Sequence, residues 1–193
     1  MENFTLSLFI LGGKNVYEFT RLNISQAFPS LTTSNKITSN NNENVIEEDK
    51  FQIDRVLKHA SVIDCQYGFM SEDCTGVIRK IKYDSATDTF IGFSTPLISG
   101  LPSYKHFQTD SFDELKNWFS TCEKAQLLNV HMFQSITINS VLSSTYLLSA
   151  YGTNSKSTSN AIWRRWIFIH DECHSKELKI IGFSTHCDGK YLG

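Results

Sequence analysis

The sequence has no excess of charge of either sign: 18 Lys and Arg residues stand against 20 Asp and Glu residues, for a net charge of −2. Because a polyanion is held by clustered positive charge, nucleic-acid binding would need a local patch or a further domain. Charged residues make up only 20% of the chain and hydrophobic residues 40%, which excludes a wholly disordered protein and a coiled coil. Three prolines and ten glycines are too few for a collagen-like or proline-rich chain.

The usual marks of export and membrane insertion are also lacking. The first three residues include no lysine or arginine, and the apolar stretch Leu6–Leu11 is broken by Ser7 and ends at Gly12. No segment approaches the roughly 20 apolar residues of a membrane span. The cysteines form no Cys-x-x-Cys pair, which favours reduced thiols; they are Cys65, Cys74, Cys122, Cys173 and Cys187. We therefore expect an intracellular protein without a signal peptide or transmembrane segment, and no membrane partner.

Two parts of different character are expected along the chain. Residues 30–50 are polar and include a run of asparagines, which predicts a loop or linker. The apolar spacing in Val16–Ile24 predicts a short helix before this linker, and the spacing from Phe51 to Ala60 predicts another after it. We therefore expect a helical and irregular N-terminal region over residues 1–60 and a second domain over residues 61–193.

The second part alternates between strand and helix patterns. Ser111 and Thr158 or Ser159 are suited to cap helices that run to Phe119 and His170. Apolar or alternating runs predict strands at residues 62–70, 127–138, 146–151 and 179–184, with a hairpin formed by 76–83 and 90–93. This order predicts an α/β (α+β) fold: a mixed sheet with flanking helices, in which the last helix crosses over between parallel strands.

Acidic residues follow the first predicted strand of the sheet. In Ser71-Glu72-Asp73-Cys74-Thr75, paired carboxylates at a strand end could bind a hard divalent cation; the alternative is a hairpin turn with solvated acids. Polar residues also follow the last strand, in Ser184–Tyr191. In α/β folds, ligands bind at the carboxyl ends of strands, although Asp188-Gly189 is also a common turn.

Two other patterns give weaker indications of a functional site. His170 and His174 are four residues apart on one predicted helix face, but Asp171 stands where a zinc protease has its catalytic Glu. A small zinc protein that uses His170, Cys173, His174 and His186 remains an alternative. Gly12-Gly13 is not followed by the Gly-Lys-Ser/Thr of a phosphate-binding loop, so we expect no small-molecule cofactor.

Taken in order, several blocks resemble the conserved core of transposon-derived proteins similar to the THAP-associated and P-element-like DNA transposases. Each block is weak alone, but the set runs from about Gly13 to the last residue. The blocks are Ala27–Ser30, Ser71–Thr75, Tyr83-Asp84 with Ile91–Phe93, Pro96-Leu97 with Gly100–Pro102, Met132–Gln134, Tyr151–Asn154, Arg165-Trp166, and Phe183–Thr185 with Asp188–Leu192.

This resemblance implies an RNase H-like catalytic core in which three carboxylates hold two Mg²⁺ ions for DNA strand cleavage and transfer. The first acid of such a core lies on the first strand, which corresponds to Asp73, with Glu72 as its neighbour. The second follows the fourth strand, where this chain has His186 in place of the expected Asp and then Asp188. The implied metal ligands are therefore Asp73, Asp188 and His186, and an imidazole is a poor ligand for Mg²⁺.

The resemblance also implies features that this sequence does not contain. The third acid is expected on a later helix, but the chain ends at Gly193, and the Cys/His spacing of a THAP zinc finger is not found. We therefore expect a truncated transposase remnant that is not an active enzyme as it stands, whose intact relatives act on DNA in the nucleus. The alternative is a domesticated protein-interaction or weak nucleic-acid-binding module that self-associates.

Overall fold

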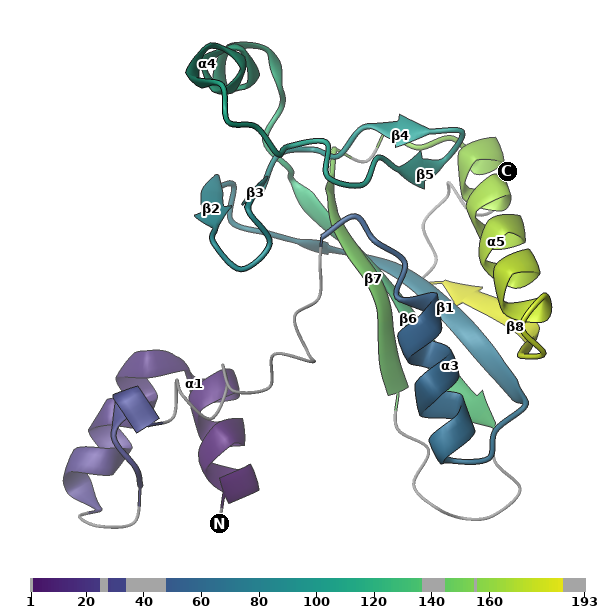
Figure 1. The fold of residues 1–193 in the computed structure, drawn as a ribbon. Helices are drawn as coiled ribbons and strands as arrows, with labels where there is room; N and C mark the ends of the chain where they lie inside the picture. The colour runs from purple at the N-terminus through teal and green to yellow at the C-terminus, as the bar shows by residue number, and fades with distance from the viewer. Residues whose placement is uncertain (1, 25–27, 34–47, 137–144, 155, 186–193) are drawn as a thin grey trace. The chain divides into compact units, whose positions relative to one another are not determined.

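The computed structural model describes residues 2–24, 28–33, 48–136, 145–154 and 156–185 (Figure 1). The chain divides into two compact units, Met1–Val45 and Ile46–Gly193. We expected the N-terminal region to extend to residue 60. The helix that includes residue 60 instead lies in the second unit, where it packs on the sheet.

The first unit contains one long helix, α1 (Glu2–Asn23). Only its C-terminal part was predicted, as a short helix over Val16–Ile24. Tyr17 is fully buried, and its hydroxyl donates a hydrogen bond to the Pro29 carbonyl at 2.9 Å while Phe28 packs edge-on against its ring. Of the helices in the described part of the chain, none combines the length and apolar character that a bilayer span requires.

The second unit confirms the predicted α/β class, with helices flanking a mixed sheet (Figure 1). The described helices of this unit are α3 (Ile53–Val62), α4 (Phe112–Thr121) and α5 (Ser159–His174). The four-stranded sheet contains β1 (Tyr67–Gly76), β6 (Leu127–Ile136), β7 (Thr145–Thr153) and β8 (Lys179–Thr185). Two small hairpins are formed by β2 (Lys82–Asp84) with β3 (Thr89–Ile91) and by β4 (Leu97–Ile98) with β5 (Leu101–Pro102).

The order of strands in the sheet is β7-β6-β1-β8. Strand β6 is antiparallel to both of its neighbours, β7 and β1, whereas β8 is parallel to β1. Strands β7 and β8 therefore run in the same direction, and α5 connects them. This confirms the predicted crossover through the last helix.

One face of the sheet is covered by α3 and α5. Each helix carries apolar residues three or four positions apart, which is the spacing that places side chains on one helix face. On α5 the cap is Thr158, whose hydroxyl accepts a hydrogen bond from the Ala161 amide at 3.3 Å. The core beneath the two helices contains Ile53, Val56, Ala60, Cys65, Met70, Phe133, Leu148, Ile169, Cys173, Leu178 and Ile180.

A second, smaller core lies between α4 and the β2–β3 hairpin. Phe93 stacks on Phe107 with 4.7 Å between ring centroids, and Trp118 of α4 packs edge-on against Phe107. Ser111 caps α4 as predicted, since its hydroxyl accepts a hydrogen bond from the Glu114 amide. A hairpin forms where one was predicted, but its first strand is β2 at Lys82–Asp84 and not residues 76–83, and β3 covers Thr89–Ile91.

The first strand of the sheet was predicted in the wrong place. A strand was expected over residues 62–70, but α3 continues to Val62 and β1 begins at Tyr67. The apolar residues from Val56 to Cys65 serve the helix and the turn that follows it, where Cys65 is buried in the core. As a result, Ser71–Thr75 lie inside β1 and not after it.

Candidate functional site

Glu72 and Asp73 point to opposite faces of the sheet. Side chains alternate along a β-strand, and β1 buries Met70 and Glu72 on the face covered by α3 and α5 while Asp73 is exposed. Neither sequence reading anticipated this. The two acids form neither a paired site at a strand end nor a solvated turn, because both lie within a ten-residue strand.

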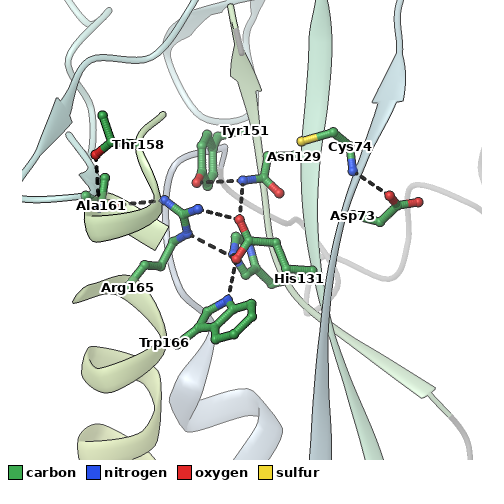
Figure 2. Close-up of polar contacts among 11 residues, drawn as sticks. Asp73, Cys74, Asn129, His131, Tyr151, Thr158, Ala161, Arg165 and Trp166 are labelled. Carbon is green, nitrogen blue, oxygen red and sulfur yellow. Dashed lines mark hydrogen bonds and ion pairs between the residues drawn. The ribbon is translucent and has the colours of Figure 1, made fainter. Parts of the chain in front are cut away.

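Glu72 is 1% exposed and is the centre of a buried polar cluster. Figure 2 labels the surrounding members of this cluster, among them Asn129, Arg165 and Trp166. Arg165, from α5, donates to the carboxylate through Nη2, with a short contact to Oε1, and through Nε at 3.4 Å to Oε2. The Trp166 indole donates to Oε2 at 2.6 Å, and the Asn129 amide of β6 donates to Oε1 at 2.8 Å. The carboxylate is therefore held by donors from a helix and from the neighbouring strand.

The same cluster extends to the surrounding elements. Arg165 also donates through Nη1 to the Gly100 carbonyl at 2.7 Å, which ties α5 to the β4–β5 hairpin. Asn129 donates to the Tyr151 hydroxyl of β7 at 2.9 Å. His131 Nε2 lies 3.3 Å from Glu72 Oε2, and its ring stacks on Tyr151. Residues of β1, β6, β7 and α5 are thus joined in one network.

The burial of these groups controls their charges. Burial alone would raise the pKa of Glu72, but hydrogen bonding to His131 and the charge and hydrogen bonds of Arg165 outweigh it and hold that pKa below its usual range. Burial lowers the pKa of His131, against the opposing hydrogen bond and charge of Glu72. Burial also raises the pKa of the Tyr151 hydroxyl. The buried charges are Glu72 and Arg165, which neutralise one another.

This pairing removes Glu72 from any metal chemistry. Its oxygens already accept from Arg165, Trp166 and Asn129, and it is 1% exposed. Arg165 was not recognised as its partner from the sequence. The available signal was its position: Arg165 follows Ile162 by three residues and precedes Ile169 by four, so it lies on the apolar stripe of α5. A charge on such a stripe is almost never buried without a partner.

Asp73 lies on the other face of β1. Figure 2 shows its carboxylate directed away from Arg165 and His131. Its Oδ1 accepts a hydrogen bond from the Cys74 amide at 2.9 Å, and its side chain is exposed. Hard divalent cations take such carboxylate oxygens as ligands.

The end of β8 lies beside this part of β1. In the parallel pair the Cα partner of Glu72 is Thr185, the last described residue of β8. His186 and Asp188, the other predicted ligands, lie outside the described residues. The meeting of Asp73 with Asp188 therefore stays a prediction.

The described residues by themselves do not fit a pair of Mg²⁺ ions. Nowhere in the described part of the chain do three or more His, Cys, Asp or Glu side chains gather in a group suited to a metal ion. Asp73 supplies one exposed carboxylate, whereas Glu72 is occupied by Arg165. No step of a metal-dependent reaction can be assigned to this set.

The histidines of α5 are separated from the cysteine beside them. His170 and His174 stack on one another with 5.7 Å between ring centroids, and His170 contacts Asp171 at 3.0 Å. Cys173 is fully buried in the core, and burial raises the pKa of its thiol to about 11. Cys173 is buried whereas His174 is exposed, and among the described residues these side chains do not form a group suited to zinc. Cys65, Cys122 and Cys173 are free thiols.

Comparison with known proteins gives one structural similarity. No protein-family model matches the chain, and no curated protein matches it. The fold is similar to that of a chain in the "Drosophila P element transposase strand transfer complex", with a TM-score of 0.48 and 12% sequence identity. The similarity covers 95% of this chain and 32% of that chain, so this chain spans about a third of its neighbour's length.

Proposed function

We propose that this chain is a transposon-derived protein with an RNase H-like core that keeps the scaffold of a strand-transfer site but does not cleave DNA. DNA as the partner of the intact proteins and a nuclear location belong to the same proposal. The sequence blocks that resemble P-element-like transposases motivate it.

One structural observation carries the proposal: the parallel pairing of β1 with β8. Three antiparallel strands are followed by a helix and by a fourth strand placed next to the first. The resemblance expects one acid on the first strand and the next just after the fourth. The pairing of Glu72 with Thr185 puts the end of β8 at the position of Asp73 along β1. This supports a shared site at that end of the two strands.

The expected loss of activity follows from the metal ligands that the chain supplies. Mg²⁺ prefers oxygen donors and tolerates little departure from octahedral geometry. Position 186, where the family has an Asp, holds a His. The nearest other carboxylate on β1, Glu72, is bound by Arg165 on the opposite face and cannot replace the missing acid.

A restored acid tests this proposal. We expect the natural protein to show no Mg²⁺- or Mn²⁺-dependent nicking of DNA, and His186→Asp to bind Mn²⁺ at least about tenfold more tightly than the natural protein. Asp73→Asn in the His186→Asp background should remove that gain. Titration calorimetry and the electron paramagnetic resonance signal of free Mn²⁺ measure the affinity.

Two results would count against it. Nicking by the natural protein that Asp73→Ala abolishes would show an active enzyme. A gain in affinity that survives Asp73→Asn would show that residues 73 and 186 do not share a site. Asp113→Asn, on the exposed side of α4, is the matched control for a nonspecific loss of negative charge.

A second candidate, a self-associating interaction module, is favoured by the face of the sheet opposite α3 and α5. Tyr67 and Phe69 of β1 are each 43% exposed, and Ile181 of β8 is 55% exposed. Contiguous exposed apolar side chains of this kind are typical of interaction surfaces.

A further inference from the structure

The segment Glu48–Lys50, which we call the strap, lies along the outer edge of β7. The Asp49 amide donates to the Ala150 carbonyl at 3.3 Å, and the Gly152 amide donates to Glu48 Oε1 at 3.0 Å. Strand β7 is at the end of the four-stranded sheet, so its outer backbone groups have no strand partner within that sheet. The strap satisfies part of this edge.

The side chain of Asp49 is buried and that of Glu48 is half-buried. Asp49 is 8% exposed, and its Oδ1 accepts a hydrogen bond from the Thr95 hydroxyl at 2.6 Å. Its φ of 72° lies in the left-handed region, which carries a steric cost for a residue other than glycine. Glu48 is half-buried and directed at the Gly152 amide. The strap is therefore held in a constrained conformation by contacts of its two acids.

The surroundings add little positive charge to these acids. Glu48 and Asp49 line a cavity of about 10 Å³ together with Thr87, Thr89, Phe90, Tyr104, Lys105 and Phe107. The ammonium groups of Lys50 and Lys105 each lie 5.4 Å from the centre of the Tyr104 ring. Asp84 of β2 contributes further negative charge to Glu48. Two neighbouring acids thus share a site that disfavours the charged form of both.

The protonation of the acids follows from this geometry. Burial raises the pKa of Glu48 to about 7, and the charge of Asp49 adds to this, against the opposing hydrogen bonds of the Gly152 and Gly92 amides. Burial raises the pKa of Asp49 to about 6, against the opposing hydrogen bond of Thr95. Both values lie well above the ordinary range of carboxyl groups, which is about 4.

We propose that the strap is a pH-sensitive clasp, which holds the outer edge of β7 while Glu48 and Asp49 carry protons and releases that edge when they ionise. A carboxyl group with a higher pKa in the closed state stabilises that state fully at a pH below its value in the open state. The stabilisation is lost as the pH rises through the closed-state value. The clasp is therefore closed below about pH 4 and loosens progressively up to about pH 7.

Phe51 and Gln52, which follow the strap, form an anchor that limits how far the chain can detach. Phe51 packs on the main core, with ring centroids 5.3 Å from His131 and 5.7 Å from Phe168. Gln52 is buried, and its amide donates to the Leu148 carbonyl at 2.7 Å. This anchor contains no acid, so it stays in place when the strap detaches. Release frees the Ala150 carbonyl and the Gly152 amide, while the Gly152 carbonyl keeps its hydrogen bond from the Thr95 amide at 2.9 Å. Backbone groups freed on a sheet edge can pair with another strand.

Amide hydrogen exchange of the full chain, followed by NMR at pH 5 and pH 8 and corrected for intrinsic rates, tests the clasp. We expect the protection of the Asp49 and Gly152 amides to fall at least about tenfold at pH 8, because one pKa unit corresponds to a tenfold change in the opening equilibrium. The Gln52 amide, within the anchor, should keep its protection and is the internal reference. The carboxyl ¹³C shifts of Glu48 and Asp49 should titrate with midpoints above pH 5.5.

The variant Glu48→Gln/Asp49→Asn mimics the protonated acids and should remove most of the pH dependence, whereas Asp113→Asn should leave it unchanged. Equal protection of the Asp49 and Gly152 amides at the two pH values would overturn the proposal, as would carboxyl midpoints near pH 4. A pH dependence that survives in the double variant would also overturn it. If the double variant does not fold, the exchange and titration of the natural protein decide alone.

Discussion

At the scale of single residues, the dominant feature is a buried ion pair at the centre of the sheet. Arg165 is fully buried and Glu72 is 1% exposed, and each supplies the opposite charge that the other needs in the interior. Transfer of one unpaired charge into a protein interior costs several kcal/mol, whereas a complete pair is close to neutral in stability. The pair therefore specifies how α5 sits on β1 more than it adds stability.

Truncation of Arg165 should expose this dependence. We expect Arg165→Met to lower the free energy of unfolding by about 3–5 kcal/mol, because Glu72 is left as an uncompensated buried charge. Urea denaturation measures the effect. Arg164→Met is the matched control, since Arg164 is the exposed neighbour on the same helix and its replacement should change stability by less than about 0.5 kcal/mol.

The double variant Glu72→Met/Arg165→Met separates charge from packing. It should recover much of the loss, because two apolar side chains of similar size replace the pair and leave no buried charge. Equal destabilisation by Arg165→Met and Arg164→Met, or no recovery in the double variant, would contradict the role given to this pair.

At the scale of elements, the docking of the β4–β5 hairpin on α5 depends on Gly100. Its φ is +89°, and a Cβ at this position would lie 2.2 Å from the Ala161 carbonyl oxygen in the first turn of α5. The Gly100 carbonyl also accepts the bond from Arg165. The close approach therefore connects the hairpin, the start of α5 and the Glu72 cluster.

Substitution at this contact should be costly. We expect Gly100→Ala to destabilise the protein by at least about 1–3 kcal/mol, from backbone strain and from the clash with Ala161. Gly76→Ala is the matched control: Gly76 ends β1 and has no atom within 4 Å of an added Cβ, so little change is expected. Thermal denaturation followed by circular dichroism compares the two. A Gly100→Ala protein as stable as Gly76→Ala would show that the hairpin can move away from α5 without cost.

At the scale of the whole molecule, a net charge of −2 gives little electrostatic repulsion between copies. The exposed apolar residues of β1 and β8 then favour association. If the second candidate function is right, sedimentation at increasing concentration should show a rising average mass. Ile181→Asp should suppress the rise by placing a charge on this surface.

The control for this measurement is Val62→Asp. Val62 is 79% exposed at the end of α3, away from the apolar residues of β1 and β8, so its replacement should leave association unchanged. A monomer at every concentration would exclude self-association. Equal suppression by the two variants would point to a general effect of charge.

The sequence by itself determined the features that depend on local signals. The caps at Ser111 and Thr158, the strands β6 and β7, and the crossover through α5 all follow from the spacing of apolar and capping residues within about ten positions. The mixed α/β class followed from their order. The start of β1 was missed because the apolar residues between α3 and β1 suit either a helix or a strand.

Only the tertiary structure decided which face each acid occupies and what charge it carries. Glu72 meets Arg165 across 93 positions of sequence, and Asp49 meets Thr95 across 46. Burial and the pKa of a carboxyl group depend on such distant neighbours, which no local pattern records. The strand expected to end at residue 70 runs to Gly76, so its alternation places Glu72 in a buried ion pair and leaves Asp73 as a single exposed carboxylate.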